Sequence, residues 1–243
     1  MAKAKYMNKA KVKDFQICVD QIRPFVYRGD FDSSFELLDE FRIGPNTLNP
    51  RGRNFAFWLI EEQSPEEEDL TTQEERRLFF EFTKLFIDKG VEIDHQDKYG
   101  VTLLNWATYT YCSELCLFLL TRGASPNIVD CNRLTPLDYA TYERYEWGDA
   151  SLAVAMGQVL IPALLRAGAD PYLPYPSLKE CKKNVNLSWN LNEEENGIEY
   201  NNLMERVVDY SHCQEMDEDF RTNMKLFLDV YREINGQNGV VSQ

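Results

Sequence analysis

The cysteine and histidine residues are the side chains of this sequence that could bind a metal ion or attack a substrate. The 243-residue chain has six cysteines but only two histidines, His95 and His212. Cys112 and Cys116 are four residues apart, so on a helix both thiols would lie on one face. Together with Cys131 and His95 they would supply four ligands of the kind that zinc takes. Because no C-x-x-C pair is present, we favour reduced thiols that mostly pack as small core residues.

Acidic side chains offer a second possible chemistry, the binding of a cation such as calcium. A run of acids without a base lies between Glu61 and Thr72 and comprises Glu61, Glu62, Glu66, Glu67, Glu68 and Asp69. A calcium loop needs alternating oxygen ligands and a glycine, and this run has neither. We therefore expect a solvated loop and no metal site, with recognition of a basic partner as the alternative role.

Motifs that would indicate catalysis are missing from the sequence. It contains no phosphate-binding loop, no G-x-S-x-G turn and no glycine pattern for a dinucleotide. We therefore expect neither enzymatic activity nor a cofactor. The alternative is a catalytic site in the C-terminal region, which would have to bring Cys181, His212 or Cys213 together with carboxylates.

Composition limits the class of protein and its partners. Apolar residues make up 44% of the chain and aromatic residues 13%, which is typical of a folded globular protein. The net charge of −14 argues against direct binding of nucleic acid, since phosphate recognition needs clustered bases. The sequence has no long apolar run for a membrane span, and its lysine-rich start lacks the apolar core of a signal peptide. We expect a cytoplasmic protein.

The segment from Asp97 to Asn127 predicts two short helices joined by a turn. Gly100 is suited to a turn with positive φ, and Thr102 stands where a helix N-cap belongs. A short apolar helix follows it, and Gly123 predicts the end of a second one. The apolar residues of the two helices are Leu103, Leu104, Trp106 and Ala107, then Leu115, Cys116, Phe118, Leu119 and Leu120.

The same unit returns along the chain. Residues 130–140 (DCNRLTPLDYA) lie 33 positions after residues 97–107, and residues 164–171 (LLRAGADP) repeat residues 119–126 (LLTRGASP). A 33-residue period with a T-P-L core is the signature of ankyrin repeats. The chain therefore resembles an ankyrin-repeat protein, which implies an all-α solenoid of stacked helix-turn-helix units.

The rest of the chain fits this pattern less regularly. We predict helices near 11–27, 35–41 and 74–89 in two degenerate repeats, a regular repeat at 97–129 and a fourth at 130–171 with an insertion. Pro162 should kink the fourth repeat's second helix or mark its start. Two amphipathic helices near 200–208 and 220–231 would cap the stack. The predicted domains are a repeat domain over 1–171, a helical cap over 172–235 and a disordered tail over 236–243.

The resemblance to ankyrin repeats also implies which residues meet a partner. In that family the turn tips and the first helices of the repeats usually bind another protein. Asn105 and Asp138 stand where the family usually has histidine, which should weaken the hydrogen bonding between turns. The predicted contact residues are Lys98, Tyr99, Val101, Tyr109 and Thr110 in the third repeat, Cys131, Asn132, Leu134, Tyr142 and Glu143 in the fourth, Tyr145 and Trp147 in its insertion, and Pro50, Arg51, Arg53, Glu61 and Glu62 in the second.

Three functions are compatible with these patterns. The leading hypothesis is a non-catalytic module that binds a protein with a basic surface and acts as an adaptor, inhibitor or immunity-type antagonist. The second is an acidic mimic of nucleic acid that blocks a cationic groove in a DNA- or RNA-handling enzyme. The third is the enzyme with a C-terminal site. The sequence does not predict an oligomeric state.

Overall fold

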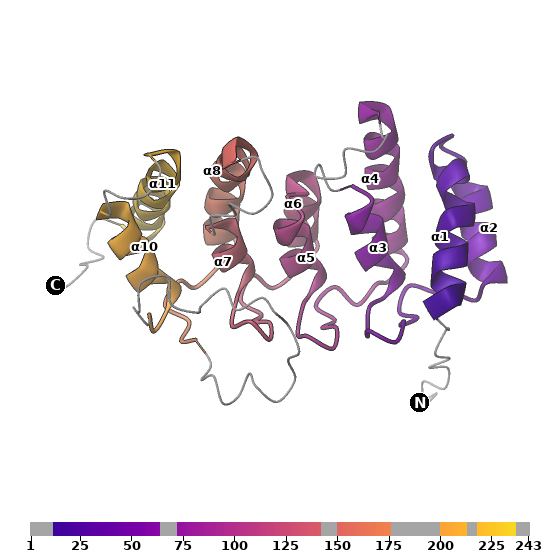
Figure 1. Cartoon of the computed structure of the whole chain (residues 1–243), viewed down its shortest axis with the longest axis horizontal. Helices are drawn as coiled ribbons and strands as arrows, with labels where there is room; N and C mark the ends of the chain where they lie inside the picture. The colour runs from indigo at the N-terminus through magenta and orange to yellow at the C-terminus, as the bar shows by residue number, and fades with distance from the viewer. Residues whose placement is uncertain (1–11, 64–71, 142–149, 176–199, 213–217, 237–243) are drawn as a thin grey trace. The chain divides into compact units, whose positions relative to one another are not determined.

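The computed structural model describes residues 12–63, 72–141, 150–175, 200–212 and 218–236 of the chain. These residues form α-helices, turns and irregular segments, and no strand occurs among them (Figure 1). They divide into two compact units, Met1–Lys98 and Tyr99–Gln243, called unit 1 and unit 2 below. The predicted division into a repeat domain ending at residue 171 and a separate cap stays a prediction.

Within the described part of unit 1, the helices form two pairs. The first pair is α1 (Val12–Val26) with α2 (Phe31–Glu40), and the second is α3 (Phe55–Glu61) with α4 (Gln73–Asp88). The turn between α1 and α2 has Gly29 at φ +70°, and the Asp30 carboxylate caps α2 by accepting from Ser33 N at 3.2 Å. Pro24 lies inside α1, two residues before its end. The predicted helices at 11–27 and 74–89 are therefore confirmed to within two residues.

Phenylalanine rings meet between the two pairs of unit 1. Phe15 on α1 meets Phe55 on α3, with ring centroids 5.8 Å apart. Phe31 and Phe35 on α2 both pack on Phe82 of α4, at centroid distances of 5.6 and 5.0 Å. Phe55 and Phe82 are fully buried. Large aromatic areas removed from water thus stabilise this unit.

The described residues of unit 2 form three pairs of helices. They are α5 (Leu103–Tyr109) with α6 (Ser113–Thr121), α7 (Pro136–Ala140) with α8 (Ala150–Arg166), and α10 (Leu203–His212) with α11 (Glu218–Asn235). Neighbouring pairs pack through α5 on α7, α6 on α8 and α8 on α11. The two predicted C-terminal helices are thus present, and α11 covers α8.

Threonine caps begin the first helices α5 and α7. The hydroxyl of Thr102 accepts from Asn105 N at 3.2 Å, and the hydroxyl of Thr135 accepts from Asp138 N at 3.3 Å. In each helix the side chain at the third position also accepts from the capping backbone N–H, so both form capping boxes. The N-cap predicted at Thr102 is confirmed.

Helix α8 is longer than its repeat pattern indicates. It begins at Ala150 and runs through Pro162 to Arg166, so Pro162 does not mark its start. Gly157 lets α11 approach closely, since a Cβ there would stand 2.4 Å from Asn223 Nδ2.

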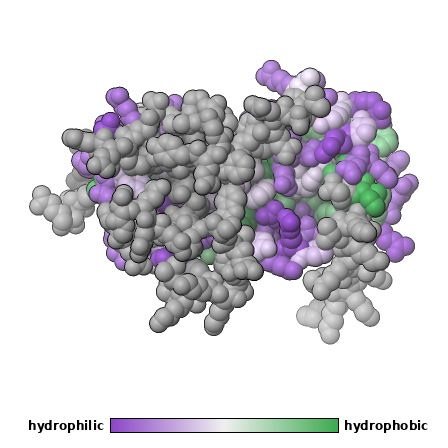
Figure 2. Space-filling model, in the orientation of Figure 1, coloured by the Kyte–Doolittle hydropathy of each residue, from purple (hydrophilic) through white to green (hydrophobic). Residues whose placement is uncertain are grey.

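No described helix has both the length and the apolarity needed to cross a lipid bilayer. Hydrophilic residues make up most of the coloured surface in Figure 2, with smaller hydrophobic areas between them.

Candidate protein-interaction surface

The turn tips of unit 1 are fixed by backbone hydrogen bonds. The Asn49 side chain accepts from the backbone N–H groups of Arg51 and Arg53 at 2.9 and 3.0 Å. Gly52 takes φ +79°, and Lys98 N donates to the Arg51 carbonyl at 3.0 Å. A Cβ at position 52 would stand 3.2 Å from Lys98 N, so glycine allows this approach. The side chains of Arg51 and Lys98 are consequently exposed at successive turns.

Arg53 has a structural role in the same turn. Its Nε donates to the Asp97 carboxylate at 2.8 Å, and the Asp97 side chain is fully buried. The guanidinium also lies over the Phe57 ring, 5.2 Å from its centroid. Because Arg53 balances a buried charge, it holds the two turns together and is less suited to bind a partner than predicted.

The turn tips of unit 2 present Tyr99 and Asn132. Cys131 N donates to the Tyr99 carbonyl at 2.7 Å, which joins the two turns as in unit 1. The Asp130 carboxylate accepts from the N–H groups of Asn132 and Leu134 at 2.8 and 3.0 Å and shapes the second turn. Tyr99, Cys131 and Asn132 are each partly exposed, as a contact with a partner requires.

Arg133 replaces a turn glycine. It has φ +70° at the position where Gly52 and Gly100 have +79° and +75°. A side chain in this left-handed region costs roughly 1 kcal/mol, which the surroundings must offset. The guanidinium lies 5.4 Å from the Tyr175 ring centroid and is buried there. Arg133 thus ties the fourth turn to the segment that follows α8.

Three aromatic side chains form a row on the first helices of unit 2. Trp106 and Tyr109 of α5 are stacked, with centroids 5.2 Å apart and an angle of 19° between the rings. Tyr109 meets Tyr139 of α7 edge-on at 5.7 Å. Trp106 and Tyr109 are partly exposed, whereas Tyr139 is buried. We call these residues the aromatic row. Trp106 was missing from the predicted contact residues, although its spacing of three from Tyr109 indicates a shared helix face.

Three predicted contact residues are buried. Val101 and Thr110 are 7% and 6% exposed, and Leu134 is fully buried. The Thr110 hydroxyl bonds the carbonyl of Trp106 at 3.0 Å, which satisfies the end of α5. These side chains pack within unit 2 and cannot meet a partner, so the prediction for them is wrong.

Other predicted residues also differ in their environment. Glu62 accepts from Arg23 Nη2 at 2.6 Å and is thereby engaged within unit 1, while Glu61 is exposed. The insertion residues lie outside the described part of the chain, as do most acids of the run that begins at Glu61. The predicted contacts affected are Tyr142, Glu143, Tyr145 and Trp147.

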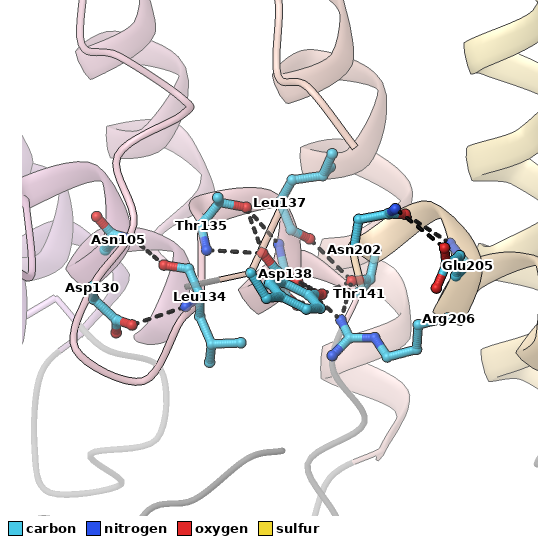
Figure 3. A network of polar contacts seen from close by, with 11 residues as sticks. Asn105, Asp130, Leu134, Thr135, Leu137, Asp138, Thr141, Asn202, Glu205 and Arg206 are labelled. Atoms are coloured by element: carbon cyan, nitrogen blue, oxygen red, sulfur yellow. Dashed lines mark hydrogen bonds and ion pairs between the residues drawn. The ribbon is translucent and has the colours of Figure 1, made fainter. Parts of the chain in front are cut away.

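Below the turns of unit 2 lies a buried polar network (Figure 3). Asn105 Nδ2 donates to the carbonyls of Ile128 and Leu134, both at 3.4 Å. Asn105, in place of the histidine of the ankyrin pattern, thus keeps hydrogen bonds to the neighbouring turn, but both are long. Asp138, where the ankyrin pattern has histidine, can only accept. It receives the Tyr175 hydroxyl at 2.5 Å and lies 3.5 Å from Arg206 Nη2.

Arg206 connects the C-terminal helices to this network. The side chains of Arg206 and Asp138 are 6% and 1% exposed. Arg206 Nη2 also donates to the Thr141 hydroxyl at 3.1 Å, at the end of α7 (Figure 3). A positive charge from α10 therefore balances the negative charge that Asp138 brings into the core.

Asp130 and Tyr139 form a second buried contact in this region. The Tyr139 hydroxyl donates to Asp130 Oδ2. Burial raises the pKa of Asp130 to about 6, against the lowering effect of the Tyr139 hydrogen bond. Burial and the nearby Asp130 charge raise the pKa of Tyr139 well above its ordinary value. The Asp130 carboxylate already accepts hydrogen bonds from the turn backbone and from the Tyr139 hydroxyl, so neither group is placed as a reactive centre.

The cysteines and histidines do not assemble into a reactive site within the described residues. No group of three or more histidine, cysteine, aspartate or glutamate side chains there is arranged to hold a metal ion. Burial raises the pKa of the Cys116 thiol to about 12, which keeps it protonated. His212 is exposed, and its Nδ1 lies 2.8 Å from the Val208 carbonyl. Cys181 and Cys213 lie outside the described residues.

Comparisons with known proteins agree with this architecture. No protein-family model matches the chain. An ankyrin repeat protein of Rickettsia bellii (strain RML369-C) is 46% identical over 52 residues, which cover 21% of this chain and 15% of that protein. A crystal structure of an ankyrin repeat domain from Acinetobacter baumannii AYE matches 84% of this chain and 78% of that chain, with a TM-score of 0.50 and 15% identity. The structural likeness concerns the fold alone.

Proposed function

We propose that this chain, an ankyrin-repeat protein of the all-α solenoid class, is a non-catalytic module that binds another protein. Stacked repeats bury the flanks of their neighbours and leave turn tips and first helices as a shaped surface. In unit 2 this surface comprises Tyr99, Trp106, Tyr109 and Asn132, which we call the unit 2 surface.

The aromatic row is the observation that carries this proposal. Tyr109 is held on one side by Trp106 and on the other by the edge of Tyr139, yet it stays partly exposed. A tyrosine fixed in this way loses little conformational entropy when a partner covers it. Tyrosine and tryptophan are also frequent anchors of protein interfaces. The geometry thus favours recognition of a protein surface.

The charge of the chain supports a partner with a basic surface. The net charge is −14, and opposite charge on a partner speeds encounter and favours the correct orientation. An adaptor, an inhibitor and an immunity-type antagonist would all use such a contact. We propose that the chain acts in a reducing compartment such as the cytoplasm, since Cys18, Cys112, Cys116 and Cys131 are thiols.

Affinity capture from the source cells tests the proposal. The bait is the wild-type chain or the double variant Tyr99→Ala/Tyr109→Ala, and the matched control is Tyr172→Ala/Tyr231→Ala. The control removes another tyrosine pair of the same unit, the exposed Tyr172 and the partly exposed Tyr231, whose rings are 5.9 Å apart. We expect the first variant to recover the main partner at least about 10-fold less well, as for interface hot spots, and the control to match wild type. Equal recovery by all three baits would contradict the proposed surface.

A further inference from the structure

An open groove lies on unit 1, and its lining includes none of the turn-tip residues described above. Its volume is about 570 Å³, and it is formed by the turn between α1 and α2, the start of α2 and the end of α4. Its lining residues are Gly29, Asp30, Phe31, Asp32, Phe35, Leu85, Asp88 and Lys89. We call this the α2–α4 groove. None of these residues belongs to the unit 2 surface.

Apolar side chains line part of the groove. Phe31 and Phe35 are partly exposed and are held by the fully buried Phe82 beneath them. Leu85, on the last turn of α4, is 44% exposed. The rings are therefore fixed in place, and a partner's side chain would meet a preformed surface.

The charge of the groove is negative. Asp30, Asp32 and Asp88 contribute three carboxylates against the single ammonium group of Lys89. Asp32 and Asp88 are exposed, and Asp30 is partly exposed. This composition would attract a cationic ligand and repel a phosphate or a carboxylate.

Lys89 shows how a cation fits against the aromatic residues. Its ammonium nitrogen lies 4.0 Å from the centroid of the Phe35 ring. Such contact between a cation and the face of a ring is favourable, and more so when water is excluded. The chain itself thus provides an example of the interaction that an incoming lysine or arginine would make.

From these observations we propose that the α2–α4 groove binds a basic segment of a partner protein that has an apolar residue beside its cationic one. Because Lys89 already covers the Phe35 ring, the incoming lysine or arginine lies against Phe31 near Asp32, and its apolar neighbour packs on Leu85. The negative charge of the groove favours a basic residue of the partner. Leu85 and the phenylalanine rings favour an apolar residue beside it. This site is distinct from the unit 2 surface and does not depend on it.

A synthetic amidated peptide of repeated Lys-Leu-Ala serves as the probe, and a peptide with glutamine in place of lysine as its control. Heteronuclear NMR of the labelled full chain should show amide shifts at residues 29–35 and 85–89 with the lysine peptide alone. Shifts spread over both units, or equal shifts with both peptides, would overturn the assignment.

Two charge-matched variants locate the site. Asp32→Asn/Asp88→Asn removes two carboxylates of the groove, whereas Glu36→Gln/Asp39→Asn removes two exposed carboxylates of α2 outside its lining. By calorimetry we expect the first to weaken peptide binding about 5- to 10-fold and the second less than about 2-fold, given the usual strength of exposed charge pairs. Equal losses would mean attraction by net charge alone and would overturn the proposal. We expect the Tyr99→Ala/Tyr109→Ala variant to bind the peptide as wild type does. A failure of the groove proposal can therefore be told apart from a failure of the unit 2 surface.

Discussion

In unit 1 the two helical pairs meet through phenylalanine rings, whereas in unit 2 the α7 and α10 helices are joined by a buried polar network. Phe31, Phe35 and Phe82 carry no charge, while Asp138 and Arg206 are charged groups removed from water. One architecture is thus stabilised by two kinds of interaction. Unit 2 also holds Asp130, whose pKa burial raises to about 6. We therefore expect the stability of unit 2 to depend on pH, whereas the aromatic contact in unit 1 contains no titrating group.

The two units nevertheless share a link between repeats. Asn46 Nδ2 donates to the Gly90 carbonyl at 2.9 Å, and its Oδ1 accepts from Glu92 N at 2.8 Å. Asn127 makes the same pair of bonds with Gly168 and Asp170, at 2.9 and 2.7 Å. The two units therefore share these asparagine-to-backbone hydrogen bonds. They differ in the side chains that pack between their helices.

Removal of the central ring should have the largest effect on unit 1. Phe82→Ala is expected to lower the free energy of unfolding by about 4 kcal/mol, since it leaves a cavity under Phe31 and Phe35. Because the ring is uncharged, urea unfolding at pH 4 and at pH 7 should give the same loss. A loss that changes between these pH values would show that the aromatic contact is coupled to a titrating group.

Removal of the buried cation should have the next largest effect, in unit 2. Arg206→Met is expected to cost about 3 kcal/mol, because Asp138 would keep a buried charge without its partner. Asp138→Asn in the Arg206→Met background should recover much of this loss in urea unfolding. If the double variant is as unstable as the single one, the pair does not act through its charges.

The pH dependence of unit 2 should be visible at Asp130. Its pKa is raised to about 6 in the folded chain, against about 3.9 for an unfolded aspartate. The folded state therefore binds the proton more tightly, and the stability contributed by the proton is lost as the pH rises from about 4 to about 6. Between pH 4 and pH 7, the unfolding free energy of wild type relative to Asp130→Asn should fall by about 2 to 3 kcal/mol.

The control for this titration is Asp32→Asn, which removes an exposed carboxylate of unit 1. Its stability difference from wild type should change little over the same pH range. A constant difference for Asp130→Asn would mean that folding does not raise the pKa of Asp130.

The asparagine links should give the smallest effects, similar in the two units. Asn46→Ala and Asn127→Ala each remove two exposed hydrogen bonds, and each should cost about 1 kcal/mol or less. Native-state hydrogen exchange assigns each loss to its own unit. A cost in one unit several times that in the other would show that the link is not equivalent in both.

Local signals in the sequence predicted much of the helical architecture. The hydroxyl of Thr102 and the glycine at position 100 act on residues a few positions away, so their roles follow from the sequence alone. The 33-residue period likewise located the α5–α6 pair and the α7 helix.

Burial between helices could not be predicted in the same way. Leu134 sits at a position that family resemblance assigns to the surface, yet it is enclosed within unit 2. Arg206 pairs with Asp138 across 68 residues, and no spacing rule links two residues so far apart. Arg133 takes a backbone conformation for which a glycine is expected, and its side chain lies against Tyr175, a residue 42 positions away.

The most direct test of the unit 2 surface is hydrogen–deuterium exchange of the chain with and without its captured partner. We expect protection on binding in the turns at residues 99–102 and 131–135, with exchange of α6 and α8 unchanged. Protection confined to α6 and α8, with both turns exchanging as in the isolated chain, would contradict it.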